Sequence, residues 1–130
     1  MVTIEEAEEI LEDVASGLPS EFYKELNGGI LLLPDVMKSR EPWGENLYTL
    51  GEYIVSPSMG KYIAIYYGSF EHVFGNYASR ESIAAELRKT LLHEFTHHLE
   101  HLAGERELEK EDERRMRMYR ERAMLRRIRR

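Results

Sequence analysis

The sequence predicts a small α+β domain, in which a short mixed or antiparallel sheet packs on a long central helix, with further helices at both ends. Three observations lead to this prediction. Residues 4–16 and 80–102 show helical periodicity, two segments rich in Tyr, Ile and Val lie between residues 47 and 67, and 130 residues allow one hydrophobic core. The chain has no cysteine, which excludes disulfide scaffolds and thiolate metal sites.

The N-terminal elements are short. Thr3 and Glu6 fit a capping box, and apolar residues then recur at helical spacing until Gly17, so a helix is expected between them. A short second helix over residues 20–26 follows a Leu-Pro-Ser break. The aliphatic run at residues 30–33, which ends at a proline, predicts a short buried strand.

The middle of the chain predicts a hairpin. Residues 47–55 and 61–67 have the composition of two antiparallel strands, and the residues between them favour a turn. Residues 36–46 form the preceding loop, for which Trp43 is the expected packing anchor. Residues 69–77 are consistent with one helical turn.

The longest predicted helix begins after Ser79, a plausible N-cap. Neither glycine nor proline occurs before Gly104, so the helix has some 20 residues and a length of about 30 Å. Steps of 100° per residue place apolar and polar side chains on opposite faces. The expected packing face carries Ala84, Leu91, Leu92, Phe95, Leu99 and Leu102, and the expected chemical face carries Glu86, His93, His97 and Glu100.

The chemical face contains His-Glu-Phe-Thr-His at residues 93–97, the HExxH pattern. His93 and His97 are one turn apart, so their imidazoles can converge on one Zn²⁺. Glu94 flanks that position and is the candidate catalytic residue, a general base for a zinc-activated water. The alternative is that His93 and His97 are surface residues of an exposed helix and bind no metal.

The third metal ligand is less well determined by the residues alone. Glu100 lies about 10 Å along the helix axis from His93, so it is expected to contact a metal ligand and not the metal itself. His98 is expected either in the core or as a partner of a metal ligand. The ligand is therefore expected from a chain that turns back after Gly104. The candidates in that segment are Glu105, Glu107 and Asp112.

The segment Leu87–Glu100 resembles the core helix of the small bacterial zincin-like metallopeptidases, also called the minimal metalloprotease family. Residues 43–53 and 62–68 are similar to that family's two characteristic strands, and the likeness covers most of residues 1–120. The resemblance implies a zincin-like domain over residues 1–112, followed by an Arg-rich helix or tail over 113–130.

The family pattern HExxHxxGxxD places an aspartate as the third metal ligand. In this chain Glu100 stands at the glycine and Ala103 at the aspartate. An insertion of about nine residues would align Asp112-Glu113-Arg114 with the Asp-Glu-Arg that follows in the family. On that alignment the resemblance implies that Asp112 is the third ligand, beside His93 and His97.

Charge is unevenly distributed along the chain. Residues 1–100 carry 7 basic and 17 acidic side chains, whereas Arg114–Arg130 has nine arginines and one acid. This basic block is where nucleic acid, an anionic surface or an acidic partner would bind. No aromatic interleaving or nucleic-acid motif accompanies it, so a solvated helix face, or a tail that pairs with the acidic body of the same domain, is favoured over nucleic-acid binding.

The leading hypothesis is a zinc-dependent peptidase acting on a peptide or protein substrate. A peptide could pair with residues 61–67 if they form a sheet edge, and Tyr66 or Tyr67 could donate to an oxyanion, although packing is the commoner role for each. The alternatives are a non-enzymatic metal-stabilised interaction module and an adaptor that binds RNA or anionic surfaces through its basic end. Neither a membrane span nor a leader is recognisable, so a cytoplasmic location is expected. The oligomeric state is not predicted.

Overall fold

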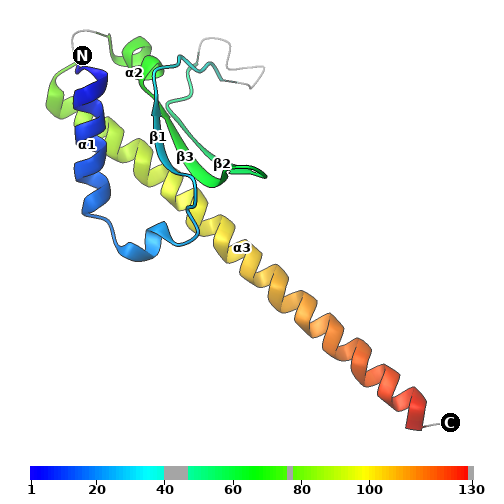
Figure 1. Cartoon of the computed structure of the whole chain (residues 1–130). Helices are drawn as coiled ribbons and strands as arrows, with labels where there is room; N and C mark the ends of the chain where they lie inside the picture. The colour runs from blue at the N-terminus through cyan, green and yellow to red at the C-terminus, as the bar shows by residue number, and fades with distance from the viewer. Residues whose placement is uncertain (40–46, 76–77, 129–130) are drawn as a thin grey trace. The chain divides into compact units, whose positions relative to one another are not determined.

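The computed structural model describes residues 1–39, 47–75 and 78–128 and has the predicted α+β fold. Two compact units are present, Met1–His98 and Leu99–Arg130, and the last helix contributes to both. The elements in chain order are helix α1 (Ile4–Ser16), 3-10 helix η1 (Ser20–Tyr23), strands β1 (Gly29–Leu33), β2 (Gly51–Ser56) and β3 (Gly60–Tyr66), and helices α2 (Tyr67–Phe74) and α3 (Arg80–Ile128) (Figure 1).

Helix α1 has the predicted capping box. The Glu6 backbone N–H donates to the Thr3 hydroxyl at 3.1 Å, and the Thr3 backbone N–H donates to the Glu6 carboxylate at 3.2 Å. These bonds satisfy groups that a helix N-terminus leaves without intrahelical partners. The helix ends at Gly17 as expected, and Ala7, Ile10 and Leu11 form its buried face.

The three strands form a mixed sheet in the order β1-β3-β2. β2 and β3 form the predicted antiparallel hairpin, whose turn uses a positive φ of 75° at Gly60. β1 pairs with β3 in parallel, so β3 is the central strand. The expectation that residues 61–67 form a sheet edge is therefore wrong, because β1 occupies the other side of that strand.

The remaining short elements follow the prediction with shifted bounds. Residues 20–26 form only the four-residue η1, whose N-cap Pro19 makes no side-chain cap. β1 is half-buried rather than fully buried because it is an edge strand. The helical turn expected within residues 69–77 is α2, which begins directly after β3. Trp43 and the loop around it lie outside the described residues.

The core of the first unit lies between the sheet and the helices α1 and α3 (Figure 1). Ile63 and Ile65 of β3 are completely buried there. They meet a row of buried side chains at four-residue spacing on α3, namely Ile83, Leu87, Leu91 and Phe95. Each such side chain stabilises the fold by about 1.5–3 kcal/mol when fully buried. This packing holds α3 against the sheet.

Helix α3 does not end at Gly104. It continues to Ile128, so the predicted reversal of the chain is wrong and the Arg-rich segment is part of the same helix. A glycine inside a helix costs only about 1 kcal/mol relative to alanine, and the residues after Gly104 are mostly strong helix formers. Ion pairs spaced by three or four residues add to this, including Glu107–Lys110 at 3.6 Å and Glu111–Arg115 at 3.7 Å. None of the described helices, long as α3 is, has an apolar stretch that could cross a membrane.

Two glycine substitutions test the close packing around α2 and the continuity of α3, and they should change the free energy of unfolding in opposite directions. A Cβ at Gly68 would lie 2.6 Å from the Pro34 carbonyl oxygen and 2.7 Å from the Asp35 carbonyl oxygen, so Gly68→Ala should lower the free energy of unfolding by about 1–3 kcal/mol. A Cβ at Gly104 meets nothing within 4 Å, so Gly104→Ala should raise it by up to about 1 kcal/mol. Urea unfolding measures both. Destabilisation by Gly104→Ala would contradict a helix that runs through that position.

Candidate metal centre

Helix α3 presents the HExxH residues from a firmly placed turn. Ser79 directly precedes the helix, and its hydroxyl accepts a hydrogen bond from the Ser82 backbone N–H at 3.1 Å, as expected for the predicted N-cap. Phe95, inside the motif, is fully buried and its ring lies 5.7 Å from that of Phe22 and 5.2 Å from that of Tyr23. These aromatic contacts fix the rotation of the helix about its axis.

The two predicted faces of α3 are only partly confirmed. Leu91 and Phe95 are buried as expected, but Ala84, Leu92 and Leu99 are only half-buried. The packing face is rotated so that Ile83, Leu87 and His98 are buried instead. His93 and His97 are exposed, whereas Glu94 is only 6% exposed.

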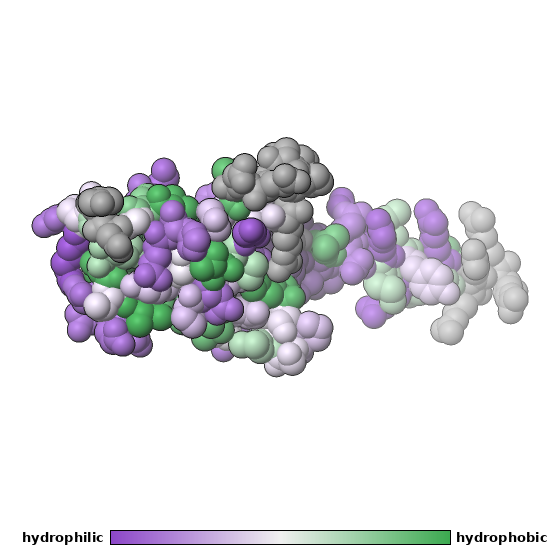
Figure 2. Space-filling view, turned by 90° about the horizontal axis from the view of Figure 1, so that it is seen from above, coloured by the Kyte–Doolittle hydropathy of each residue, from purple (hydrophilic) through white to green (hydrophobic). Residues whose placement is uncertain are grey.

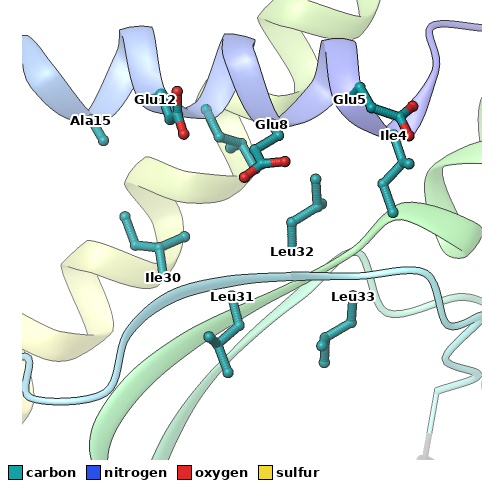
Figure 3. Close-up of a pocket in the computed structure, with 10 residues that line it drawn as sticks. Ile4, Glu5, Glu8, Glu12, Ala15, Ile30, Leu31, Leu32 and Leu33 are labelled. Carbon is teal, nitrogen blue, oxygen red and sulfur yellow. The ribbon is translucent and has the colours of Figure 1, made fainter.

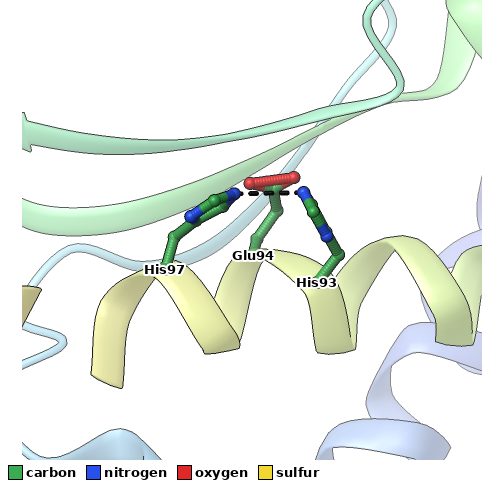
Figure 4. A group of neighbouring side chains, drawn as sticks. All are labelled: His93, Glu94 and His97. Atoms are coloured by element: carbon green, nitrogen blue, oxygen red, sulfur yellow. Dashed lines mark hydrogen bonds between the residues drawn. The ribbon is translucent and has the colours of Figure 1, made fainter. Parts of the chain in front are cut away.

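The two motif histidines converge on one point, as the spacing predicts (Figure 4). Their Nε2 atoms are 3.0 Å apart, and the rings meet edge to face with centroids 4.6 Å apart. One potential ligand atom from each of His93, Glu94 and His97 lies within 4.8 Å of the others. This is the one such group of three or more among the described residues.

This arrangement fits a zinc ion. Two nitrogens bound to one tetrahedral zinc at 2.0–2.1 Å lie about 3.3 Å apart, so His93 and His97 need to separate by only a few tenths of an ångström. Both side chains are exposed and can make that adjustment. Imidazole nitrogens are ligands that zinc accepts, and the chain has no thiolate that would compete for the metal.

Glu94 is held between the histidines and the sheet. Burial raises the pKa of Glu94, and the charge of Glu52 raises it further. The neighbouring His93 and His97 and a hydrogen bond from the Tyr53 backbone N–H act in the opposite direction. The carboxylate therefore has a fixed orientation and an affinity for protons above that of an exposed glutamate.

His98 is a core residue, in agreement with the prediction. Its Nε2 lies 2.8 Å from the Lys24 carbonyl oxygen, which can only accept, so Nε2 carries the proton. Its Nδ1 then accepts a hydrogen bond from the Tyr53 hydroxyl at 2.7 Å. With both ring nitrogens engaged and the side chain fully buried, His98 ties α3 to β2 and to the segment after η1.

A cleft of about 390 Å³ opens beside the histidines. One wall consists of residues 48–51, which lead into β2, and the other of Glu86, Lys89, Thr90, His93 and Glu94 on α3. β2 pairs with β3 on one side only, and among the described residues no strand pairs with its other side. The segment that leads into β2 is itself paired, because Lys38 forms an antiparallel bridge with Tyr48 and the Thr49 backbone N–H donates to the Met37 carbonyl at 2.7 Å. The unpaired edge among the described residues is therefore that of β2 itself, and not that of the strand that the sequence indicated.

The structure does not bring Asp112 to the histidines by the predicted route. Residues 104–112 are helical, so the chain does not turn back after Gly104. Glu105 and Glu107 lie on the same continuous helix, where Glu105 is 2.6 Å from His101 and Glu107 is 3.6 Å from Lys110. Glu100 is exposed and, like these three residues, lies outside the group that meets at Glu94.

Tyr66 and Tyr67, which the sequence indicated as possible oxyanion donors, have other contacts, and so has His72. The Tyr66 hydroxyl donates to Glu52 at 3.1 Å, and the Tyr67 hydroxyl donates to the Val2 carbonyl at 2.6 Å. The His72 ring stacks on Tyr48, with centroids 5.0 Å apart. These contacts are structural, in agreement with the packing role expected for the two tyrosines.

A second groove, of about 440 Å³, runs between α1 and β1 (Figure 3). Aliphatic side chains such as Ile30 and Leu32 form its floor, and Glu5, Glu8 and Glu12 line it from α1. It contains no histidine or hydroxyl side chain, so it offers neither the imidazoles nor the nucleophile that hydrolysis would need.

Sequence reasoning missed two features that position the site. Gly51 lets β2 approach α3, since a Cβ there would lie 2.8 Å from Thr90 Cγ2 and 3.3 Å from the Ala64 carbonyl oxygen. Tyr53 contacts both Glu94 and His98. A glycine inside a strand pattern is a signal for close approach and would have indicated the first. No sequence signal identifies the partners of Tyr53.

Taken together, these residues define a small α+β protein with a candidate metal centre on its longest helix. No protein-family model matches the chain, and no curated protein matches its sequence. It is similar to a conserved hypothetical protein of known structure from T. thermophilus, with 36% identity and a TM-score of 0.65 over 79% of this chain and 99% of that one. The chain belongs to the same family as that protein. The match supports the fold, and the function must be argued from the site.

The Tyr53–His98 contact can be tested without reference to any activity. Tyr53→Phe removes the donor to Nδ1 of a fully buried histidine, and should lower the free energy of unfolding by about 1–3 kcal/mol. Tyr62→Phe, on the neighbouring strand β3, is the matched control and should leave it nearly unchanged. Chemical denaturation measures both, and equal stability of the two variants would show that the contact contributes nothing.

Proposed function

We propose that this protein is a zinc-dependent peptide hydrolase in which His93 and His97 bind the metal and Glu94 is the general base. The observation that carries the proposal is the convergence of the two Nε2 atoms beside a buried carboxylate. Zinc held there would polarise a substrate carbonyl and lower the pKa of a coordinated water to about 7. A catalytic zinc ion is held by three protein ligands, and His93 and His97 supply two of them.

Glu94 has the properties that a general base requires. Its raised pKa lies closer to neutral pH than that of an exposed glutamate, which favours accepting a proton from water. As the water oxygen forms a bond to the carbonyl carbon, Glu94 takes the proton, and it returns the proton to the amine nitrogen when the C–N bond breaks. The Tyr53 backbone N–H keeps the carboxylate oriented through both transfers.

The surroundings support a peptide as the substrate. The cleft beside His93 is bounded by the segment that leads into β2. Residues 47–49 of that segment pair with residues 37–39, but the outer side of β2 itself, Gly51–Ser56, has no paired strand among the described residues. An extended peptide can hydrogen-bond to such an edge and be held along the sheet.

The decisive variant is Glu94→Gln, which keeps the size of the side chain and removes its basicity. It should retain zinc, measured by elemental analysis after dialysis, and should lose at least about 100-fold in hydrolysis of a peptide library read by mass spectrometry. His97→Ala should lose both the metal and the activity.

Two further variants serve as controls. Glu81→Gln, at an exposed position in the first turn of α3, should leave zinc content and hydrolysis unchanged. Asp112→Asn tests the ligand that the sequence favoured, and it should also leave zinc content unchanged because the chain does not reverse before it. A protein that binds zinc but is indifferent to Glu94→Gln would instead be a metal-stabilised module, and the proposal would be wrong.

A further inference from the structure

The second unit, considered alone, carries large apolar side chains on an exposed helix. Leu108 is 68% exposed, Met116 is 52% exposed and Tyr119 is 69% exposed. At 100° per residue these three positions fall within an arc of about 80° on one face of α3. Figure 2 shows apolar residues interspersed among hydrophilic ones toward the C-terminal end of the helix. A soluble helix gains stability when such a face is covered.

The charges on this part of α3 are segregated along its axis. Residues 99–113 contain seven acidic and two basic side chains, whereas residues 114–125 contain five arginines and one glutamate. The helix is therefore acidic in its first half and basic in its second. Two such helices attract each other when they run antiparallel and repel each other when they run parallel.

We propose that this part of α3 pairs antiparallel with the same part of a second copy of the chain. Spacings of three and four residues define a seam, as in a coiled coil. The seam positions are Glu105, Leu108, Asp112, Arg115, Tyr119 and Arg122.

One register satisfies both the apolar and the charged positions of this seam. Leu108 lies opposite Tyr119 of the second copy, so each of the two symmetric contacts covers a pair of exposed apolar side chains. Asp112 lies opposite Arg115 at the centre. Glu105 lies opposite Arg122 toward the ends. Every seam residue thus has a complementary partner, and the pairing is closed by two-fold symmetry.

An anionic partner explains less of this surface. RNA or an anionic membrane would use the arginines, but it would leave Leu108 exposed and would be repelled by the acidic half of the helix. A second copy of the chain would contact both the acidic and the basic half of this part of α3. The occupant we infer is therefore another molecule of this protein.

Charge reversal in the full-length protein tests the pairing. Glu105→Arg and Arg122→Glu each create like-charge contacts in their own homodimers, so sedimentation equilibrium should show at least about tenfold weaker association for each. An equimolar mixture of the two variants restores opposite charges at both contacts and should dimerise as wild type does. Glu107→Arg, which lies roughly 100° around the helix from the seam, is the matched control and should dimerise normally.

The absence of cysteine allows a direct test of direction and register. Residues 108 and 119 are about 16 Å apart along one helix, so the antiparallel pairing should give a disulfide between Leu108→Cys and Tyr119→Cys chains when they are mixed and oxidised. Neither variant should cross-link with itself. Self-cross-linking of Leu108→Cys would indicate parallel pairing and contradict the proposal.

Two other outcomes would also contradict the proposed antiparallel pairing. A wild-type protein that stays monomeric at about 100 μM and low salt, where a micromolar dimer would be mostly associated, would show that the helix is stable alone. A monomer that binds an RNA oligonucleotide, and loses that binding in Arg115→Glu and Arg122→Glu, would assign the surface to nucleic acid instead. Circular dichroism confirms in each case that the variants keep their helix content.

Discussion

The approach of strand β2 to helix α3 is the constraint on which the rest of the first unit depends. Gly51 permits it, because a side chain at that position would meet Thr90 of the helix and the backbone of the neighbouring strand. The buried row on α3 and the two central isoleucines of β3 hold the helix at that distance. A looser contact would leave Glu94 in water, where its pKa and orientation would be those of an ordinary surface carboxylate.

Tyr53 links the structural and the chemical parts of this contact. Its backbone N–H donates to Glu94, and its hydroxyl donates to His98 one turn further along the same helix. His98 in turn donates to the Lys24 carbonyl. Three segments distant in sequence are thereby joined by polar contacts around a motif whose other two histidines are exposed. The buried histidine provides rigidity, and the exposed pair is accessible to a ligand.

Much of the fold could be predicted because local signals and tertiary packing agree. The capping box at Thr3, the stop at Gly17 and the turn at Gly60 all act through neighbouring residues. Strand order could not be predicted, because pairing of β1 with β3 is a contact between distant segments. The prediction that the helix ends at Gly104 was wrong, because strong helix-forming residues on both sides outweigh the cost of one glycine.

The candidate site, like the fold, could be predicted only where it depends on neighbouring residues. The spacing of His93 and His97 fixes their convergence within a single helical turn, so the sequence was sufficient for it. The burial of Glu94 and the partners of Tyr53 depend on the position of β2, which the motif does not encode. The third ligand was sought in a chain reversal that the continuous helix does not make.

The central claim is that two imidazoles of one helix share a divalent ion beside a buried carboxylate. X-ray absorption spectroscopy of the zinc-loaded protein measures this most directly. The account predicts a zinc shell that contains two imidazole nitrogens at about 2.0–2.1 Å. A protein that takes up no zinc under zinc-replete conditions, or a zinc shell without imidazole scattering, would contradict it.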